Sequence, residues 1–237
     1  MAKTVIITGL SSGIGAATAK KFYKEGYNVV GFSRNLEKQR KVANKHEFDP
    51  NRSLLIKGDV TKEEDVKNAV KQTIKAFKKI DVLVNNAGFG KFGIVEELEL
   101  KDFEEQFSVN VFGVFLMTKH VLKHMKERDE GQIIMISSMA GKNHFKGGTA
   151  YASTKWALQG FTGCLKTELR PTKIKVGTIL PGSVDTAFFD EVGMSPNPKR
   201  CLKPSDISRQ IYNLANQDKH SDIDEIIVRP AHTPEEK

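Results

Sequence analysis

The most informative segment for the fold lies near the N-terminus and reads Lys3-Thr4-Val5-Ile6-Ile7-Thr8, followed by Gly9-Leu10-Ser11-Ser12-Gly13-Ile14-Gly15. The first part is a short β-branched run, which is typical of a buried strand. The second part is a glycine-rich turn that leads into the helix-forming stretch 16–22. Glycines let a backbone approach phosphates closely, and a helix N-terminus offers free N–H groups and the positive end of its dipole. Together these segments predict a binding site for a nucleotide pyrophosphate.

Strand-like and helix-like segments alternate along the rest of the chain. Strands are predicted at 27–33, 53–58, 82–85, 132–137, 175–180 and 225–228, and helices at 36–44, 102–125, 151–169 and 203–216. The capping-box pattern Thr61-Lys62-Glu63-Glu64 predicts one more helix that begins within about one residue of Thr61. The alternation indicates an α/β fold: a single-domain, doubly wound Rossmann parallel sheet of about seven strands with helices on both faces. Because no linker marks a boundary, residues 1–237 are predicted to form one domain, with a polar and loose tail over 229–237.

The net charge of +8 at pH 7 comes from lysines that are spread over several predicted helices. In 36–45, 62–79 and 119–126 these lysines alternate with apolar positions, which is typical of solvated outer faces. Aromatic residues do not interleave with them as they would on a surface that stacks bases. We therefore expect no nucleic-acid partner, although positive charge of this size would favour an anionic dinucleotide.

Cysteine usage and hydropathy point to the cell interior. Cys164 and Cys201 form no C-x-x-C pair and no His/Cys cluster, so neither a disulfide framework nor a metal site is predicted. No stretch approaches the ~18 apolar residues of a membrane span, and the chain passes into its first strand without a signal-peptide pattern. We expect a cytoplasmic protein with no membrane partner.

A second informative stretch is Tyr151-Ala152-Ser153-Thr154-Lys155, with Ser138 thirteen positions before the tyrosine. A helix has about 3.6 residues per turn, so Tyr151 and Lys155 share one face. A phenol with a pKa of about 10 is a poor acid or base at neutral pH. A nearby ammonium favours the phenolate and is expected to lower that pKa, which would make Tyr151 a usable proton-transfer group. Such a pair also occurs on solvated helix faces, so its value depends on the motifs that accompany it.

Together these motifs resemble the short-chain dehydrogenase/reductase family over nearly the whole chain. Thr8–Gly15 is similar to the family's T-G-x-x-x-G-I-G cofactor motif, and Asn85-Asn86-Ala87-Gly88 to its N-N-A-G motif. Asn110 and Ser138 stand where the family keeps a catalytic asparagine and serine. Pro181-Gly182-Ser183-Val184-Asp185-Thr186 resembles the P-G-x-V-x-T segment beside the nicotinamide.

The resemblance implies hydride transfer between a nicotinamide and a carbon that bears oxygen. Tyr151 would act as general acid/base, Lys155 would lower its pKa and bind the nicotinamide ribose, Ser138 would hydrogen-bond the substrate oxygen, and Asn110 would support a water linked to Lys155. The implied cofactor-binding residues are Gly9, Ser11, Ser12, Gly13, Ile14, Gly15, Ser33, Arg34, Asp59, Val60, Asn86, Ala87, Gly88, Tyr151, Lys155, Pro181, Gly182, Val184 and Thr186.

The end of the second strand predicts which nicotinamide cofactor is used. An acidic residue there would bind the adenosine 2′-hydroxyl, whereas an arginine accommodates a 2′-phosphate. Ser33 occupies the position where NAD-preferring relatives carry aspartate, and Arg34 follows it. A guanidinium forms charge-assisted bonds to phosphate, so NADP is predicted in preference to NAD.

The segment 186–203 is expected to close over the substrate as a short lid, with apolar walls supplied by Phe188, Phe189 and Met194 and by Phe89, Phe92, His144 and Phe145 from other loops. A lid this short favours a small to medium ketone, aldehyde or 3-hydroxy acid. Two alternatives stay open: a 3-oxoacyl-carrier-protein reductase, and a catalytically inactive dinucleotide-binding sensor or scaffold.

The family resemblance also implies assembly through the helices at 102–125 and 151–169, both of which are rich in apolar residues. A homodimer or homotetramer is therefore expected.

Overall fold

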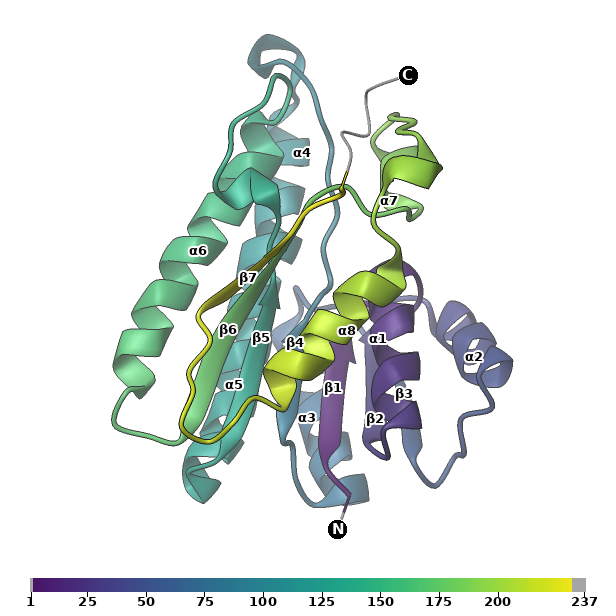
Figure 1. Ribbon diagram of the computed structural model, residues 1–237, viewed down its shortest axis with the longest axis vertical. Coiled ribbons are helices and arrows are strands. Elements are labelled where there is room, and N and C mark those ends of the chain that lie inside the picture. The colour runs from purple at the N-terminus through teal and green to yellow at the C-terminus, as the bar shows by residue number, and fades with distance from the viewer. Residues whose placement is uncertain (1, 232–237) are drawn as a thin grey trace.

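The computed structural model of the protein describes residues 2–231 and contains one seven-stranded, fully parallel sheet flanked by helices (Figure 1). The strands are β1 (Thr4–Thr8), β2 (Asn28–Ser33), β3 (Ser53–Lys57), β4 (Val82–Asn85), β5 (Gly131–Ile136), β6 (Ile174–Pro181) and β7 (Glu225–Val228). The helices are α1 (Gly13–Lys24), α2 (Leu36–Lys45), α3 (Glu63–Phe77), α4 (Leu100–Phe107), α5 (Val114–Arg128), α6 (Thr149–Leu169), α7 (Phe188–Glu191) and α8 (Pro204–Ala215). The predicted fold class is confirmed.

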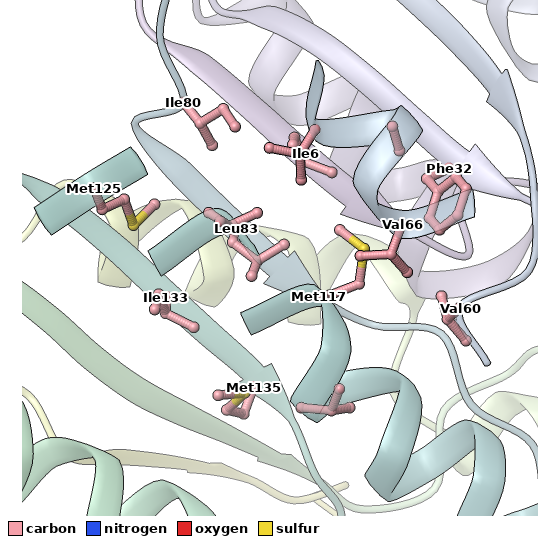
Figure 2. Close-up of a cluster of buried hydrophobic side chains, with 14 of the residues drawn as sticks. Ile6, Phe32, Val60, Val66, Ile80, Leu83, Met117, Met125, Ile133 and Met135 are labelled. Carbon is pink, nitrogen blue, oxygen red and sulfur yellow. The ribbon is translucent and has the colours of Figure 1, made fainter. Parts of the chain in front are cut away.

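Successive side chains of a strand point to opposite faces, and both faces of this sheet are covered. Ile6 of β1 belongs to a core shared with α3, α5 and α6, and Figure 2 shows it with Phe32, Leu83 and Met117 in that layer. Its neighbours Val5 and Ile7 belong to a second core shared with α1, α2 and α8. The continuous β-branched run of β1 is therefore explained by burial on both sides.

The strand order is β3-β2-β1-β4-β5-β6-β7. The chain builds outward from β1 in one direction as far as β3 and then crosses back to place β4 on the other side of β1. In an open parallel sheet, ligands bind outside the carboxyl ends of the strands at this switch point. The ends of β1 and β4 therefore mark the place to look for a site.

Two predicted elements differ from the structure. The helix predicted at 102–125 is α4 and α5 joined by a π-helical turn over Ser108–Gly113. The capping box at Thr61 is wrong: α3 begins at Glu63 after Lys62, and the Thr61 backbone N–H and hydroxyl both donate to the Asp59 carboxylate at 3.0 and 2.9 Å. The hydroxyl is thus bound to Asp59, one residue before the N-cap position Lys62, and does not cap the helix, although the helix itself begins where it was predicted to within about one residue.

The segment 186–203 has a fixed base. Val184 bridges to Leu202, and the Asp185 N–H donates to the Leu202 carbonyl at 2.8 Å. The segment contains the short helix α7, which lies above the carboxyl end of the sheet (Figure 1). Most of the tail predicted to be loose, residues 232–237, lies outside the described residues. Within residues 2–231, no helix is long and apolar enough to cross a membrane.

Candidate functional site

The glycine-rich turn joins β1 to α1 by an unusually close approach. Gly9 has a φ of +71°, in the left-handed region that favours glycine. A Cβ on Gly15, inside the first turn of α1, would lie 2.2 Å from the Gly9 carbonyl oxygen, so only glycine fits there. Ser11 and Ser12 lie between these glycines, and Ser12 precedes the first residue of α1. The turn therefore forms a cradle at the positive end of a helix, which suits a pyrophosphate.

The segment after β4 is fastened to this cradle. The Thr8 hydroxyl accepts the backbone N–H groups of Asn86 and Ala87, both at 2.9 Å. The Asn86 amide donates to the Thr8 carbonyl at 2.8 Å. Thr8, whose role the motif alone does not reveal, therefore fixes the spacing between the ends of β1 and β4.

Tyr151 lies near the start of α6 with its ring partly buried. Burial raises the pKa of Tyr151 to about 12, and a hydrogen bond from Ser138 acts in the opposite direction. Ser138 itself follows β5, and its hydroxyl also accepts the Ala140 N–H at 3.1 Å. Burial is the largest influence on the pKa of this phenol, and the lowering expected from Lys155 stays a prediction.

Lys155 is one turn further along α6 and only 6% exposed. Its ammonium donates to the Ile136 carbonyl at 3.1 Å and lies 5.5 Å from the centre of the Tyr151 ring. Burial lowers the pKa of Lys155 to about 8. The amine therefore stays predominantly charged at neutral pH, but at a cost in folding free energy.

Asn110 sits in the π-helical turn and is 1% exposed. Its amide donates to the Phe89 carbonyl at 2.9 Å, and its side-chain oxygen accepts the Phe89 N–H at 3.1 Å. The same amide donates to the Thr154 hydroxyl at 3.1 Å, a contact that the sequence did not reveal. A π-turn widens the helix and often occurs at functional sites. Here it directs Asn110 toward the loop after β4, next to Gly88.

At the end of β2, Ser33 has a buried hydroxyl that meets no hydrogen-bond partner among the described residues. Arg34 follows as an exposed residue, and Asn35 caps α2 by accepting the Lys38 N–H at 2.9 Å. The Arg34 guanidinium forms no ion pair with a carboxylate among residues 2–231, so together with the neighbouring hydroxyl it suits an added anionic acceptor.

The remaining cofactor candidates lie in two places, after β3 and after β6. Asp59 is held by Thr61, and a Cβ on Gly113 would lie 2.7 Å from a Val60 methyl group, so Val60 packs against the π-turn. After β6, the Gly182 N–H donates to the Val228 carbonyl at 2.8 Å. Thr186 reaches the first loop, since its methyl would lie 3.2 Å from a Cβ on Gly13. The loops after β1 and β6 thus meet.

Aromatic side chains enclose Tyr151. The rings of Phe92 and Phe188 each lie 5.5 Å from the Tyr151 ring, and Phe145 lies 5.2 Å from Phe92. His144, which was considered as another wall, instead stacks on Trp156 at 5.5 Å. The α7 helix therefore places an apolar wall directly on the tyrosine.

Comparison with known proteins agrees with this geometry. The family model for short chain dehydrogenases matches residues 3–196. An uncharacterized oxidoreductase from Staphylococcus aureus (strain MRSA252) is 34% identical over 96% of this chain and 97% of its own length.

Two solved structures are similar over the whole fold. An alcohol dehydrogenase from Thermococcus sibiricus, complexed with 5-hydroxy-NADP, has a TM-score of 0.88 and 30% identity over 98% of this chain and 97% of its own. A 3-ketoacyl-(acyl-carrier-protein) reductase from Brucella melitensis, complexed with NADH, has a TM-score of 0.89 and 31% identity over 97% of both chains. The chain belongs to the short-chain dehydrogenase/reductase family of oxidoreductases.

The buried amine gives a prediction about stability. With a pKa of about 8 in the folded state and an ordinary value of 10.5, the charged Lys155 costs roughly 3 kcal/mol at pH 7. This cost is fully present below pH 8 and disappears as the pH rises toward 10.5. Lys155→Met keeps the length of the side chain and gives up one hydrogen bond of about 1 kcal/mol. It should therefore raise the free energy of unfolding by about 2 kcal/mol at pH 7, measured by urea denaturation without added nucleotide.

The gain should shrink between pH 8 and pH 10. The exposed Lys71→Met provides the control and should change stability by less than about 0.5 kcal/mol at either pH. An equal gain from Lys155→Met at pH 7 and pH 10 would contradict the buried-charge explanation.

Proposed function

We propose that this protein is an NADP-dependent oxidoreductase that interconverts a carbonyl compound and its alcohol. The observation that carries the proposal is the arrangement of Tyr151, Ser138 and Lys155 beside a glycine cradle at the start of α1. The nicotinamide cofactor supplies the hydride chemistry, and the protein supplies position and charge. The T. sibiricus relative, described as an alcohol dehydrogenase with bound 5-hydroxy-NADP, supports both parts of the proposal.

In this proposal each catalytic residue has a definite task. The Tyr151 hydroxyl keeps its proton at neutral pH because its pKa is about 12, so it is in the right state to protonate a substrate oxygen in the reduction direction. Ser138, already hydrogen-bonded to Tyr151, would orient the same oxygen. Lys155 would bind ribose hydroxyls and place a positive charge near the tyrosine. Asn110 would hold the Phe89 loop and Thr154 of α6 in register.

The cofactor residues fit a nicotinamide dinucleotide. The cradle formed by Gly9, Gly13 and Gly15 would hold the pyrophosphate, with N–H groups from the start of α1. The unsatisfied Ser33 hydroxyl and the exposed Arg34 would bind a 2′-phosphate. The Asn86-Ala87-Gly88 segment and the loop from Pro181 to Thr186 would line the nicotinamide end.

A second candidate function is reduction of a 3-oxoacyl group on a carrier protein. It is supported by similarity to the B. melitensis 3-ketoacyl-(acyl-carrier-protein) reductase. The two functions differ in substrate rather than in chemistry, so a substrate panel separates them. An inactive sensor or scaffold is less well supported, because Tyr151, Lys155 and Ser138 are all present and adjacent.

Removal of the phenol tests the catalytic assignment. Tyr151→Phe keeps the ring and should lower kcat by about two to four orders of magnitude, while nucleotide binding measured by fluorescence changes little. Tyr212→Phe removes a hydroxyl on α8 and serves as the matched control with near-normal kcat. Near-normal turnover by Tyr151→Phe would contradict the role of Tyr151 as the general acid/base.

The end of β2 tests cofactor choice. The wild type should show a higher kcat/KM with NADPH than with NADH. Ser33→Asp should narrow or invert that ratio because a carboxylate repels the 2′-phosphate, and Arg34→Gln should lower it by removing a charge-assisted bond. Lys41→Gln removes an exposed cation further along α2 and should leave the ratio unchanged. Equal use of both cofactors by the wild type would rule out the phosphate role of Arg34.

The aromatic wall tests the substrate class. We propose a small to medium, partly apolar ketone, aldehyde or 3-hydroxy acid, because Phe92 and Phe188 flank Tyr151 closely. Phe188→Ala should raise kcat/KM for bulky ketones relative to small ones, whereas Phe189→Ala, whose ring packs on Phe188, should not. A wild-type preference for carrier-linked 3-oxoacyl thioesters over free small ketones would favour the second candidate instead.

We also propose that the protein is a homodimer or homotetramer. Val114, Leu158 and Leu165 are buried in the core. Phe115 of α5 and Trp156 of α6 are instead 47% and 45% exposed, and Phe112 of the π-helical turn before α5 is 56% exposed. Clustered aromatic exposure of this kind marks interaction surfaces. Light scattering at micromolar concentration should give at least twice the chain mass, and Phe115→Glu should reduce it while Val95→Glu, at another exposed apolar residue, should not. A monomeric mass for the wild type would contradict the proposed oligomer.

A further inference from the structure

A second concave region lies away from the proposed catalytic centre. A cavity of about 230 Å³ is formed by one face of α1 and the segment at the end of α2, with walls from Lys20, Tyr23, Lys24, Lys45, His46, Glu47 and Phe48. Lys20, Tyr23 and Lys24 are spaced by three and four residues, so they project from the same face of the helix. Figure 1 shows α1 and α2 near the β3 end of the sheet.

This cavity is separate from the glycine cradle. Lys20 and Lys24 follow the first residue of α1 by seven and eleven positions. A helix rises about 1.5 Å per residue, so these lysines lie roughly 10 and 16 Å further along the axis. A dinucleotide seated at the start of α1, at the carboxyl ends of the strands, would not occupy the region around them.

The cavity concentrates positive charge. Lys20, Lys24 and Lys45 converge on it, and none of the three forms an ion pair with a carboxylate among residues 2–231. Neighbouring lysines are different: Lys21 pairs with Glu25 at 2.7 Å. Glu47 is the one acidic residue among the walls. Burial and the charges of Lys20, Lys45 and Lys24, in that order, lower the pKa of His46, which shows that these ammonium groups act on one point.

The floor of the cavity is aromatic and firmly held. The Tyr23 and Phe48 rings stack at 4.4 Å with an interplanar angle of 25°. The Arg52 guanidinium lies 4.4 Å from the Tyr23 ring centre and donates to the Tyr23 carbonyl at 2.8 Å. The Asp49 N–H donates to the Tyr23 hydroxyl at 2.7 Å. The site therefore combines a group of lysines with an aromatic pair that is held in place at its floor, a combination of polar and apolar lining that small-ligand sites use.

We propose that this cavity binds a small organic phosphate, with the phosphate among Lys20, Lys24 and Lys45 and the organic part against Tyr23 and Phe48. A volume of about 230 Å³ suits a small molecule. A phosphate dianion would satisfy ammonium groups that have no acidic partner, and an aromatic or other apolar substituent would cover the stacked rings. The binding would be independent of the proposed oxidoreductase activity.

The experiment follows the imidazole of His46 by NMR as a local reporter, in protein saturated with NADP⁺ so that the dinucleotide site is not free for the probe. The His46 signal is identified among those of the six histidines by its absence from the spectrum of His46→Gln. The charges of Lys20, Lys45 and Lys24 act on His46, and Glu47 is the charged group of opposite sign that also lines the cavity. The pKa of His46 is measured with sodium chloride, inorganic phosphate and phenyl phosphate at equal ionic strength.

Both phosphates should raise the pKa of His46 saturably at millimolar concentration or below, since a bound dianion favours the imidazolium, and phenyl phosphate should saturate first. In Lys20→Gln/Lys45→Gln the pKa should start closer to the ordinary value and respond no more than it does to chloride. Lys71→Gln/Lys75→Gln makes the same change of charge on α3 and should behave like the wild type.

Two results would overturn the proposal. One is an equal response to chloride and to phosphate, which would mean simple screening. The other is a phosphate response that survives in Lys20→Gln/Lys45→Gln. Saturation by inorganic phosphate with no gain from phenyl phosphate would reject the role of the aromatic floor and hence the organic ligand.

Discussion

The geometry of the whole site depends on the contact between the start of α1 and the end of β1. Gly15 lies so close to the Gly9 carbonyl that no side chain fits between them. Asn86 then reaches across from β4 to the same pair of segments, donating to Thr8 and, at 3.3 Å, to Gly9. These contacts fix the start of α1 at the carboxyl ends of β1 and β4, and a helix N-terminus in such a place is suited to an anion.

Burial disfavours the charged form of both titratable residues in the proposed catalytic pair. It raises the pKa of Tyr151 and lowers that of Lys155, so both side chains move toward their neutral forms. Ser138 opposes the shift on the tyrosine by hydrogen bonding. A helical Y-x-x-x-K pattern therefore fixes where the two groups lie, whereas their acidities depend on how deeply the loops and the aromatic wall bury them. Only the first of these can be read from spacing.

Much of the fold followed from local patterns because the strands are buried on both faces and the turns carry glycine. The alternation predicted every strand to within about two residues, and the motifs brought Asn110, Ser138, Tyr151 and Lys155 to one edge of the sheet. The features that the sequence does not predict are those in which a side chain has more than one possible hydrogen-bond partner. Thr61 bonds to Asp59 instead of capping α3, and the π-turn at Asn110 is invisible in a pattern that suits a continuous helix. The link from Asn110 to Thr154 joins residues 44 positions apart, which no periodicity reveals.

The lysines on α1 show why composition alone does not identify a binding site. Cations in the last turn of a helix are favoured by its dipole, so Lys21 and Lys24 each have a structural reason to be there. For Lys21 this reason is sufficient, because its charge is also paired with the Glu25 carboxylate one turn later in the helix. Lys24 and Lys20 instead line, together with Lys45, a cavity floored by Tyr23 and Phe48. Helix stability alone does not call for that grouping of lysines, whereas the proposed phosphate would account for it.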